Sequence, residues 1–299
     1  TPHPLWSRGL GDVYKRQAPV NIHRIDWMWA NKAVFDANGI SVPTSWDELN
    51  AAAEKLQAAG IIPFAHGGQA WQDATVFEAV AMGIGGNNYY KNCYVDLKET
   101  CLRSETTVKV FDQMRKLQGF TDEGSPGRDW NVATGMVIEG KAGFQIMGDW
   151  AKGEFTAAGK VPGVDYYCAA TPSNNGYLYN VDSFIFYKTS DPDKQEGQKL
   201  LAKLMMGKNF QKVFNLYKGS IPARLDVPMD EFDKCAKTSN SDIKTAGASG
   251  GLVPSFAHGM AQGNTMKAAL QDVITEHFNS DMSSVDAANA LADSVLDNM

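Results

Sequence analysis

Short apolar runs alternate along this chain with longer amphipathic stretches, and this alternation limits the fold more than any other feature. The runs are IIPFA (61–65), AGFQIM (142–147), YYCAA (166–170) and SFIFY (183–187). Their lengths suit buried strands. Strands that alternate with helices are typical of an α/β architecture with mixed or parallel sheets. No clean linker divides the 299 residues, so we expect about two domains that are interwoven, with the chain crossing between them more than once.

The amphipathic stretches carry helix signals. Ser45 and Glu48 form a capping box, and the apolar face that follows it ends at Gly60. Ser104 opens a second helix, in which apolar residues recur at three-residue steps from 108 to 117. Four further helices are predicted over residues 194–206, 209–217, 266–278 and 285–296.

The composition is that of an ordinary globular chain and argues against several classes of function. Lys and Arg number 28 and Asp and Glu 34, which gives a formal charge of −6 and no basic stripe for nucleic acid. The sequence contains no run of 18 apolar residues, so no membrane span is predicted. None of the five histidines forms an i, i+4 pair and no C-x-x-C occurs, so we expect no metal and no cofactor.

Two stretches come close to catalytic motifs. Residues 135–142 nearly match a phosphate-binding loop, but Ala142 replaces the Ser or Thr that holds magnesium. Residues 247–251 match G-x-S-x-G, which requires an apolar strand before it. Their flank, 240–251, is polar and small, so we expect a flexible loop there. Carboxylates are plentiful, and a glycosidase pair stays open on sequence alone.

The four cysteines are compatible with two states on their count alone. Two disulfides would suit an oxidising compartment, and four buried thiols would suit a cytosolic protein. Cys93 and Cys101 are close enough in sequence to pair across a short loop. We predict that Cys168, on an expected strand, and Cys235, on an expected helix, lie within disulfide reach, with Cα atoms less than ~7 Å apart.

A large indole stands where one of the apolar runs ends. In GKAGFQIMGDWAKGEF (140–155), Gly148 breaks the run and Asp149 is predicted to cap a following short helix. Trp150 is therefore expected at a strand-to-helix corner, where side chains often point into clefts. It is either a hydrophobic plug, the usual place of Trp, or an aromatic platform for a ligand.

Several stretches together resemble a known family. They are PVNIHRIDWMWANKAVFDANGISVPTSWDELNAAAEKL (19–56), MVIEGKAGFQIMGDWAKGEF (136–155), YNVDSFIFYKTSD (179–191), FQKVFNLYKGSIPAR (210–224) and GLVPSFAHGM (251–260). Their order and spacing resemble the extracellular sugar-binding proteins of bacterial ABC importers, the maltose-binding-protein-like family. The resemblance covers about residues 18 to 299 and is closest to the glucose-binding branch of Gram-negative periplasms.

The resemblance implies a two-lobe periplasmic binding protein fold of type 2, with ligand in the cleft. The chain starts near the family's first hinge crossing, so the first lobe is expected to be incomplete and sugar binding weak or absent. The implied organisation is a non-native-looking leader (1–17), mostly the second lobe (18–182), a returning segment of the first lobe (183–225) and C-terminal helices on the second lobe (226–299).

The implied function is that of a non-catalytic periplasmic receptor for glucose or a similar monosaccharide. It would deliver the sugar to the membrane permease subunits of an ABC importer and would act as a monomer. Two alternatives stay open, a receptor for an oligosaccharide or polyol and an enzyme that cleaves glycosides.

The resemblance also implies site residues. It makes Trp150 a stacking platform and adds Asn180, Asp182, Lys218 and His258 as polar contacts. Asp182 and Lys218 are expected on one side of the cleft, with His258 facing the shared space. Each has a structural alternative: a turn for Asn180 and Asp182, a favoured helix C-terminal charge for Lys218, and a buried structural histidine for His258.

A weaker candidate is the loop at 66–73. It follows an apolar run and precedes a helix, so it should emerge at a sheet edge, where α/β proteins place ligands. Trp71 and Gln72 are the expected contacts in this loop, and Trp130 and Asn131 are weaker candidates still.

Overall fold

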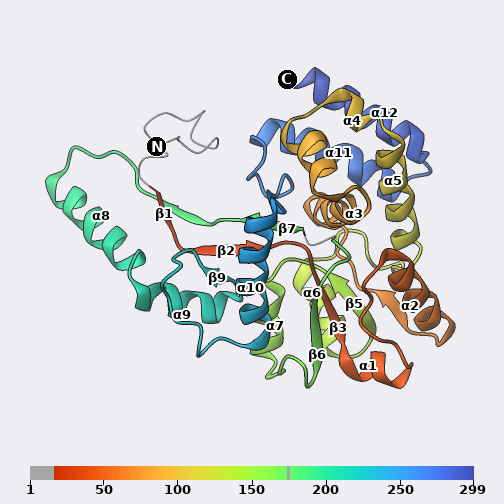
Figure 1. The fold of residues 1–299 in the computed structure, drawn as a ribbon, viewed down its shortest axis with the longest axis horizontal. Helices are drawn as coiled ribbons and strands as arrows, with labels where there is room; N and C mark the ends of the chain where they lie inside the picture. The colour runs from red at the N-terminus through yellow and green to blue at the C-terminus, as the bar shows by residue number, and fades with distance from the viewer. Residues whose placement is uncertain (1–16, 174–175) are drawn as a thin grey trace.

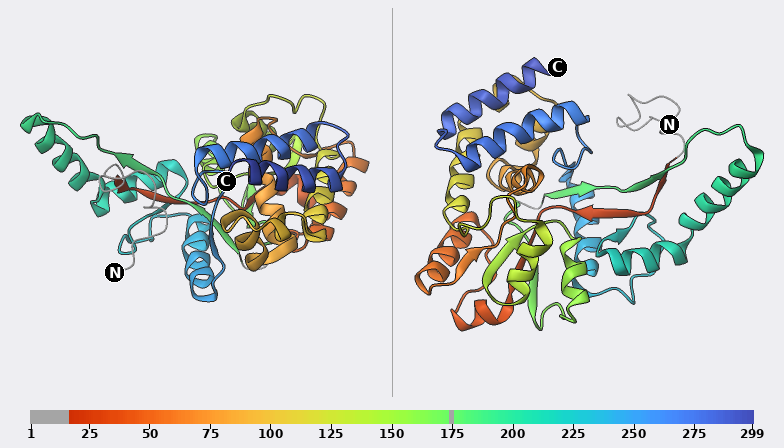
Figure 2. Two further views of the ribbon diagram at one scale, coloured as in Figure 1. Left: turned by 90° about the horizontal axis from the view of Figure 1, so that it is seen from above. Right: turned by 180° about the vertical axis from the view of Figure 1, so that it is seen from behind.

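The chain forms two lobes of unequal size (Figures 1 and 2). The computed structural model describes residues 17–173 and 176–299. The large lobe holds a mixed sheet made of β4 (Ile62–Phe64), β5 (Ala142–Ile146), β3 (Trp27–Asn31) and β6 (Tyr166–Ala170), in that order. β3 is antiparallel to β5 and β6, and β4 is parallel to β5. Three of the four predicted strands lie in this sheet, and the α/β prediction is confirmed.

A second sheet extends from the large lobe toward the small one (Figure 1). Its order is β10 (Leu252–Pro254), β7 (Tyr177–Asn180), β2 (Asn21–Arg24) and β9 (Ile221–Pro222). Farther out, β1 (Gln17–Pro19) pairs antiparallel with β8 (Ser183–Ile185), the fourth predicted strand. Since β2 is followed within three residues by β3, the chain passes there from one sheet into the other.

Helices build most of the large lobe. α3 (Ala70–Tyr90) is the central one, and it packs against α5 (Glu105–Gln118) and α11 (Asn264–Asn279), with α12 (Ser284–Asp297) against both of these. Their facing apolar side chains, such as Phe77, are fully buried. The remaining elements of this lobe are α1 (Lys32–Ala37), α2 (Trp46–Ala58), η3 (Lys91–Val95), α4 (Glu99–Leu102), α6 (Trp130–Ile138) and α7 (Ala151–Ala157).

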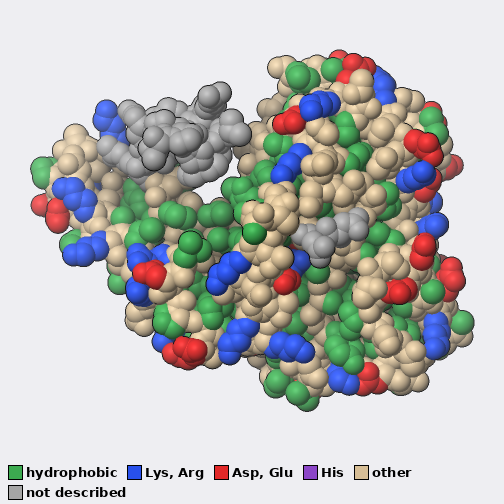
Figure 3. All heavy atoms as spheres, in the orientation of Figure 1, with side chains coloured by type: hydrophobic (Ala, Val, Ile, Leu, Met, Phe, Trp, Pro, Cys, Tyr) green, Lys and Arg blue, Asp and Glu red, His purple; other side chains and the backbone are tan. Residues whose placement is uncertain are grey.

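The small lobe consists of α8 (Pro192–Met205) and α9 (Lys208–Lys218) with the strands β1, β8 and β9 (Figure 1). α10 (Lys234–Ser249) lies beside the second sheet and contacts β7, β9 and β10. Hydrophobic side chains gather on the surface of the small lobe (Figure 3). The exposed ones include Phe184, Ile185, Tyr187, Leu200, Leu201, Leu204, Val213 and Tyr217.

The predicted helix starts are confirmed at both Ser residues. The Ser45 side chain accepts from the Glu48 N–H, and Ser104 accepts from Thr107 N–H. The Glu48 carboxylate departs from a simple capping box, because it accepts from the N–H and the hydroxyl of Thr44 at 2.7 and 2.8 Å. The four other predicted helices correspond to α8, α9, α11 and α12.

Two local predictions were wrong. Residues 240–249 are not a flexible loop, because they belong to α10, which Asp233 caps at its start and Gly250 ends in a left-handed conformation. Asp149 does not cap α7: the N-cap position is Trp150, and the Asp149 carboxylate instead accepts from the Arg24 N–H and pairs with His23. The Asp149 carboxylate forms a charge-assisted hydrogen bond with His23, which is stronger than a bond to the backbone N–H groups at the start of α7.

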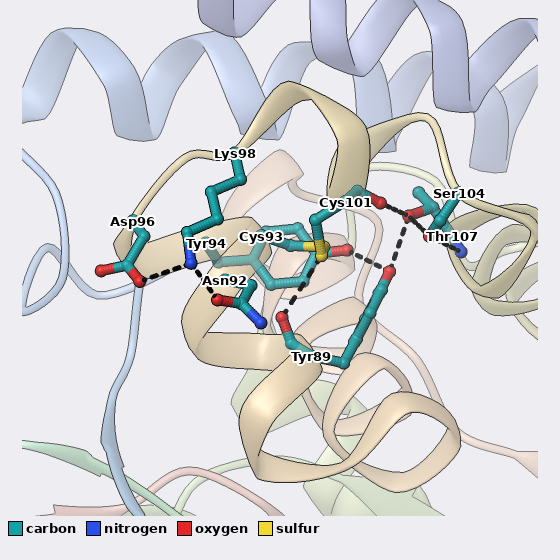
Figure 4. Close-up of a disulfide and its surroundings, with 9 residues drawn as sticks. All are labelled: Tyr89, Asn92, Cys93, Tyr94, Asp96, Lys98, Cys101, Ser104 and Thr107. Carbon is teal, nitrogen blue, oxygen red and sulfur yellow. Dashed lines mark hydrogen bonds and ion pairs between the residues drawn. A yellow bond between two sulfur atoms is a disulfide. The ribbon is translucent and has the colours of Figure 1, made fainter.

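Both predicted disulfides are present. Cys93–Cys101 joins η3 to α4 with Cα atoms 5.2 Å apart, and Cys168–Cys235 joins β6 to α10 at 6.0 Å. Figure 4 shows the first bridge beside Tyr89, whose hydroxyl hydrogen-bonds with Tyr94 and Thr107. None of the described helices is long and apolar enough to cross a membrane.

Candidate functional site

Trp150 lies at the corner that follows β5, and Gly148 makes room for its ring. A Cβ atom at position 148 would stand only 2.3 Å from the indole, so the ring can fold back over this residue only because it is glycine. Trp150 is half-buried. Its ring centroid lies 5.0 Å from that of His258, 5.3 Å from His23 and 6.4 Å from Trp71.

These four rings form a cluster, called the ring cluster below, that the chain assembles from distant segments. Trp71 comes from the first turn of α3, His258 from the turn after β10, and His23 from β2. Trp71 and His258 also meet each other edge to face, at 6.0 Å. Such edge contacts are a favoured geometry for aromatic rings. The structure thus brings together Trp150, Trp71 and His258, three of the candidate site residues.

His258 is held as a neutral ring. Its Nε2 lies 3.0 Å from the Thr75 hydroxyl, which itself donates to the Trp71 carbonyl, so Nε2–H is the donor to Thr75. Burial, aided by the positive charges of His23 and Lys267, lowers the pKa of His258 to about 3. The ring therefore adds a polar but uncharged edge to the cluster at neutral pH.

A buried carboxylate fixes the turn that carries His258. Glu78, on α3, accepts from the Ser255 hydroxyl at 2.7 Å and from the N–H groups of Phe256 and Ala257 at 3.1 and 3.3 Å. The Tyr90 hydroxyl donates to it as well, at 2.9 Å. Burial outweighs these bonds and raises the pKa of Glu78 to about 7.

Asp182 lies between β7 and β8 and is the most highly bonded of the predicted polar contacts. Its Oδ2 accepts from Asn21 Nδ2 and His23 Nε2, and its Oδ1 accepts from Asn180 Nδ2, each at 3.0 Å. The side chain remains 44% exposed. Partial burial works against ionisation, but His23, Asn21 and the Lys218 charge together hold the pKa of Asp182 well below its usual range.

Lys218 reaches the same neighbourhood from the end of α9. The following Gly219 has a left-handed φ of 91° and approaches the Asp149 backbone so closely that a Cβ would stand 2.5 Å from its carbonyl oxygen. This contact places the end of α9 against the corner that carries Trp150. Lys218 is half-buried, and its charge is close enough to act electrostatically on Asp182.

Three weaker candidates have other places. Gln72 is fully buried and donates to the Gln69 side chain at 3.1 Å and to the Arg128 carbonyl at 3.0 Å. Gln69 also accepts from the Trp71 indole N–H at 2.8 Å, so Gln72 helps to orient Trp71 and has no exposed surface for a ligand. Trp130 and Asn131 begin α6, where Trp130 packs on the core that includes Trp29 and Asn131 is exposed.

Sequence reasoning missed His23, Asn21 and Asp149 as parts of the site. All three are fully or almost fully buried polar residues. The signal was present in NIHRID (21–26), where four polar residues occupy a stretch short enough for a strand, since buried polar groups need partners.

A separate pocket lined by Asn31, Lys160 and other residues shares no side chain with the ring cluster. Among the described residues, no cluster of His, Cys, Asp and Glu could hold a metal.

The chain is similar to known solute receptors in sequence and in fold. It is 47% identical to a "probable sugar-binding periplasmic protein" of Brucella suis over 98% of this chain and 70% of that protein. It is 45% identical to one of Rhizobium meliloti over 93% of this chain and 67% of that protein. Among solved structures, the bacterial solute receptor AcbH, described as exclusively preferring b-D-galactopyranose, matches with a TM-score of 0.79 at 19% identity (95% of this chain, 71% of that one).

The fold of maltose-bound T. maritima MalE3 also matches, with a TM-score of 0.73 at 19% identity, over 95% of this chain and 73% of that one. These likenesses identify the two-lobe type 2 solute-binding fold. The model of the family described as "bacterial extracellular solute-binding protein" matches residues 3–205, which include most of the leading segment outside the described residues. The chain therefore belongs to the bacterial extracellular solute-binding protein family.

Proposed function

We propose that this chain is a non-catalytic periplasmic receptor that binds a sugar and delivers it to the permease subunits of an ABC importer. The observation that carries the proposal is the convergence of aromatic and polar groups at one corner. Trp71 lies beside Trp150, and Trp150 meets His23, which bonds to the partly exposed carboxylate of Asp182. The names of the relatives support the same class of ligand.

The arrangement suits the two kinds of surface that a pyranose presents. The axial C–H groups carry a weak positive potential and stack on the negative face of an indole, the role proposed for Trp150. The hydroxyls require partners, because an unpaired buried hydroxyl costs about 1–3 kcal/mol. Asp182 would accept from hydroxyls, and Lys218 and Asn180 would donate to them. His258 would contribute the edge of a neutral ring.

The carboxylates of the site favour binding over catalysis. Asp149 is 3% exposed and is occupied by His23 and the Arg24 N–H, so it cannot reach a substrate. Asp182 is held ionised by its neighbours, which leaves it unsuited to donate a proton. A glycosidase needs two carboxyl groups that both face the scissile bond. We therefore infer that the chain does not cleave glycosides.

We infer a monosaccharide such as glucose as the ligand, since the matches at Asn180, Asp182, Lys218 and His258 follow the glucose-binding branch. A short oligosaccharide is the second candidate, because maltose is bound in one of the structures that shares this fold. The two disulfides support an oxidising compartment such as the periplasm.

The test is a fluorescence titration of the chain and of Trp150→Ala with glucose, galactose, xylose, maltose and raffinose up to tens of millimolar. We expect one of these sugars to bind. Loss of the indole should weaken that binding by ~1–3 kcal/mol, about 5- to 150-fold in Kd, the scale of a buried aromatic contact.

The matched control is Trp46→Phe. Trp46 begins α2, and its indole N–H has no hydrogen-bond partner among the described residues, so phenylalanine loses no bond there. This variant should keep the parent affinity. Equal affinities of the parent and Trp150→Ala would contradict the proposal, and so would release of free sugar from aryl glycosides by the purified chain.

A further inference from the structure

Resting on the proposed sugar site, we propose that His23 is its positioning residue, a buried imidazolium that fixes the Asp182 carboxylate relative to Trp150 without touching the ligand. His23 is only 1% exposed. It lies on β2, at the place where the chain enters the large lobe, and its ring meets Trp150 edge to face.

Both nitrogens of the His23 ring face carboxylate oxygens. Nδ1 contacts Oδ1 of Asp149, and Nε2 lies 3.0 Å from Oδ2 of Asp182. An ionised carboxylate only accepts hydrogen bonds, so each ring nitrogen has to carry a proton. The Asn21 amide, which lies 3.0 Å from both Nε2 and Oδ2, then donates to the Asp182 oxygen. The two carboxylate contacts therefore favour the doubly protonated ring over a neutral ring that accepts from Asn21 at Nε2.

The two carboxylates are fixed from their other sides as well. Asp149 Oδ2 accepts from the Arg24 N–H at 3.0 Å, and the Asp182 N–H donates to Asn21 Oδ1 at 2.9 Å. Trp150 directly follows Asp149 in the chain. His23 thus links Asp149, the residue before Trp150, to Asp182, the carboxylate that would accept from the sugar. Through this link the positions of Trp150 and Asp182 depend on each other.

The charged and titratable groups around this link come from four elements. Asp149 follows β5, Asp182 follows β7, Lys218 ends α9 and His258 follows β10. His258 is neutral at pH 7, for the reasons given above. If His23 lost its proton, two carboxylates would face a neutral ring and the bond to one of them would be lost.

The pH dependence follows from these neighbours. Burial opposes the charge, but Asp149 and Asp182 outweigh it and raise the pKa of His23 from 6.5 to about 9. Because the pKa is raised in the folded state, the imidazolium contributes fully to the free energy of unfolding below pH 6.5, and this contribution is lost as the pH rises through about 9. The folded protein keeps the charged ring, and with it the position of Asp182, until the pH approaches about 9. Sugar affinity should therefore be constant from about pH 5 to 8 and fall above that range.

The experiment measures sugar affinity from pH 5 to 10 for the parent, His23→Gln, Asp149→Asn and Lys218→Arg. His23→Gln should bind about 10- to 100-fold more weakly at pH 7, since it loses a charge-assisted hydrogen bond, and should show no alkaline decline. Asp149→Asn should shift the decline to lower pH, since one of the two carboxylates that hold the proton is neutral. Lys218→Arg keeps its charge throughout and should keep the decline.

Two further measurements check the protonation of His23 directly and control for the loss of a buried histidine. ¹⁵N NMR of the histidine rings of the parent should show His23 with both nitrogens protonated at pH 7, and a neutral ring would overturn the proposal without any sugar. His277→Gln is the matched control for loss of a buried histidine, because the ring nitrogens of His277 have no hydrogen-bond partner among the described residues. It should lower stability and leave the pH profile unchanged.

The outcomes separate the two proposals. Parent-like affinity and pH profile in His23→Gln, together with lost binding in Asp182→Asn, would overturn the role of His23 and leave the sugar site standing. A decline that disappears in Lys218→Arg would assign it to the lysine and also overturn the role of His23. Full binding by both Asp182→Asn and Trp150→Ala, or no binding by the parent, would overturn the sugar site and this inference with it.

Discussion

Single residues at the ring cluster owe their positions to buried polar groups rather than to apolar packing. Glu78 shows this most clearly, since its carboxylate accepts from Ser255, Phe256, Ala257 and Tyr90 and so ties the turn before His258 to α3. All four partners are donors, so the site needs an acceptor with several lone pairs.

Glu78→Gln should therefore destabilise the fold despite its similar shape. The amide nitrogen would face hydroxyl or N–H donors, and at least one buried donor would lose its acceptor, at a cost of about 1–3 kcal/mol in the free energy of unfolding. Urea denaturation measures this. The pKa of Glu78 is raised from 4.5 to about 7, so the parent should lose stability as the pH rises through this interval, and the variant should lack that loss. A variant with the stability and pH dependence of the parent would show that the contacts of Glu78 matter little.

Elements that follow hydrophobic periodicity could be predicted from the sequence. The strands at 62–64, 142–146, 166–170 and 183–185 are apolar runs, and α5 has its apolar face at the expected spacing. β2 does not follow this periodicity, because it carries His23 and Arg24, whose burial depends on Asp149, Asp182 and Asp242 far away in the chain.

α10 was missed for a different reason. Its sequence, KCAKTSNSDIKTAGAS, has few large apolar residues, and only four of its positions are buried. Its end signals, Asp233 and Gly250, are visible in the sequence, but they were outweighed by its small and polar composition. Of the site, Trp150, Asp182, Lys218 and His258 could be proposed from resemblance, whereas His23 could not, because its role depends on two carboxylates 126 and 159 residues away.

The two disulfides should contribute unequally to stability. Cys168–Cys235 closes a separation of 67 residues and Cys93–Cys101 one of 8. Since the entropy removed from the unfolded chain grows with loop length, Cys168→Ala/Cys235→Ala should cost about 4 kcal/mol and Cys93→Ala/Cys101→Ala about 2.5 kcal/mol. Guanidinium denaturation of the two double variants gives the comparison. The reverse order would mean that the native contacts around the short bridge outweigh loop entropy.

At the scale of the whole molecule, the end of α9 in the small lobe lies against the corner of the large lobe that carries Trp150. Arg24 links β2 to neighbouring elements. Its guanidinium lies over the rings of Trp27 and Tyr177, each at 4.8 Å. It also pairs with Asp26 and with Asp242 of α10. Receptors of two lobes hold their ligand by closing both over it. Lys218 from the small lobe and Trp71 and Trp150 from the large lobe would then hold the sugar from two sides.

The most direct test of this account is an NMR titration of the chain with glucose, in which the indole N–H signals are assigned by Trp→Phe variants. NMR detects binding even at millimolar Kd. We predict that the signals of Trp71 and Trp150 shift with one saturating curve while that of Trp46 stays in place, and that Trp150→Ala weakens the remaining shift of Trp71. If glucose and the other sugars of the panel move no indole signal, or move Trp46 and spare Trp150, the sugar site does not lie at this corner.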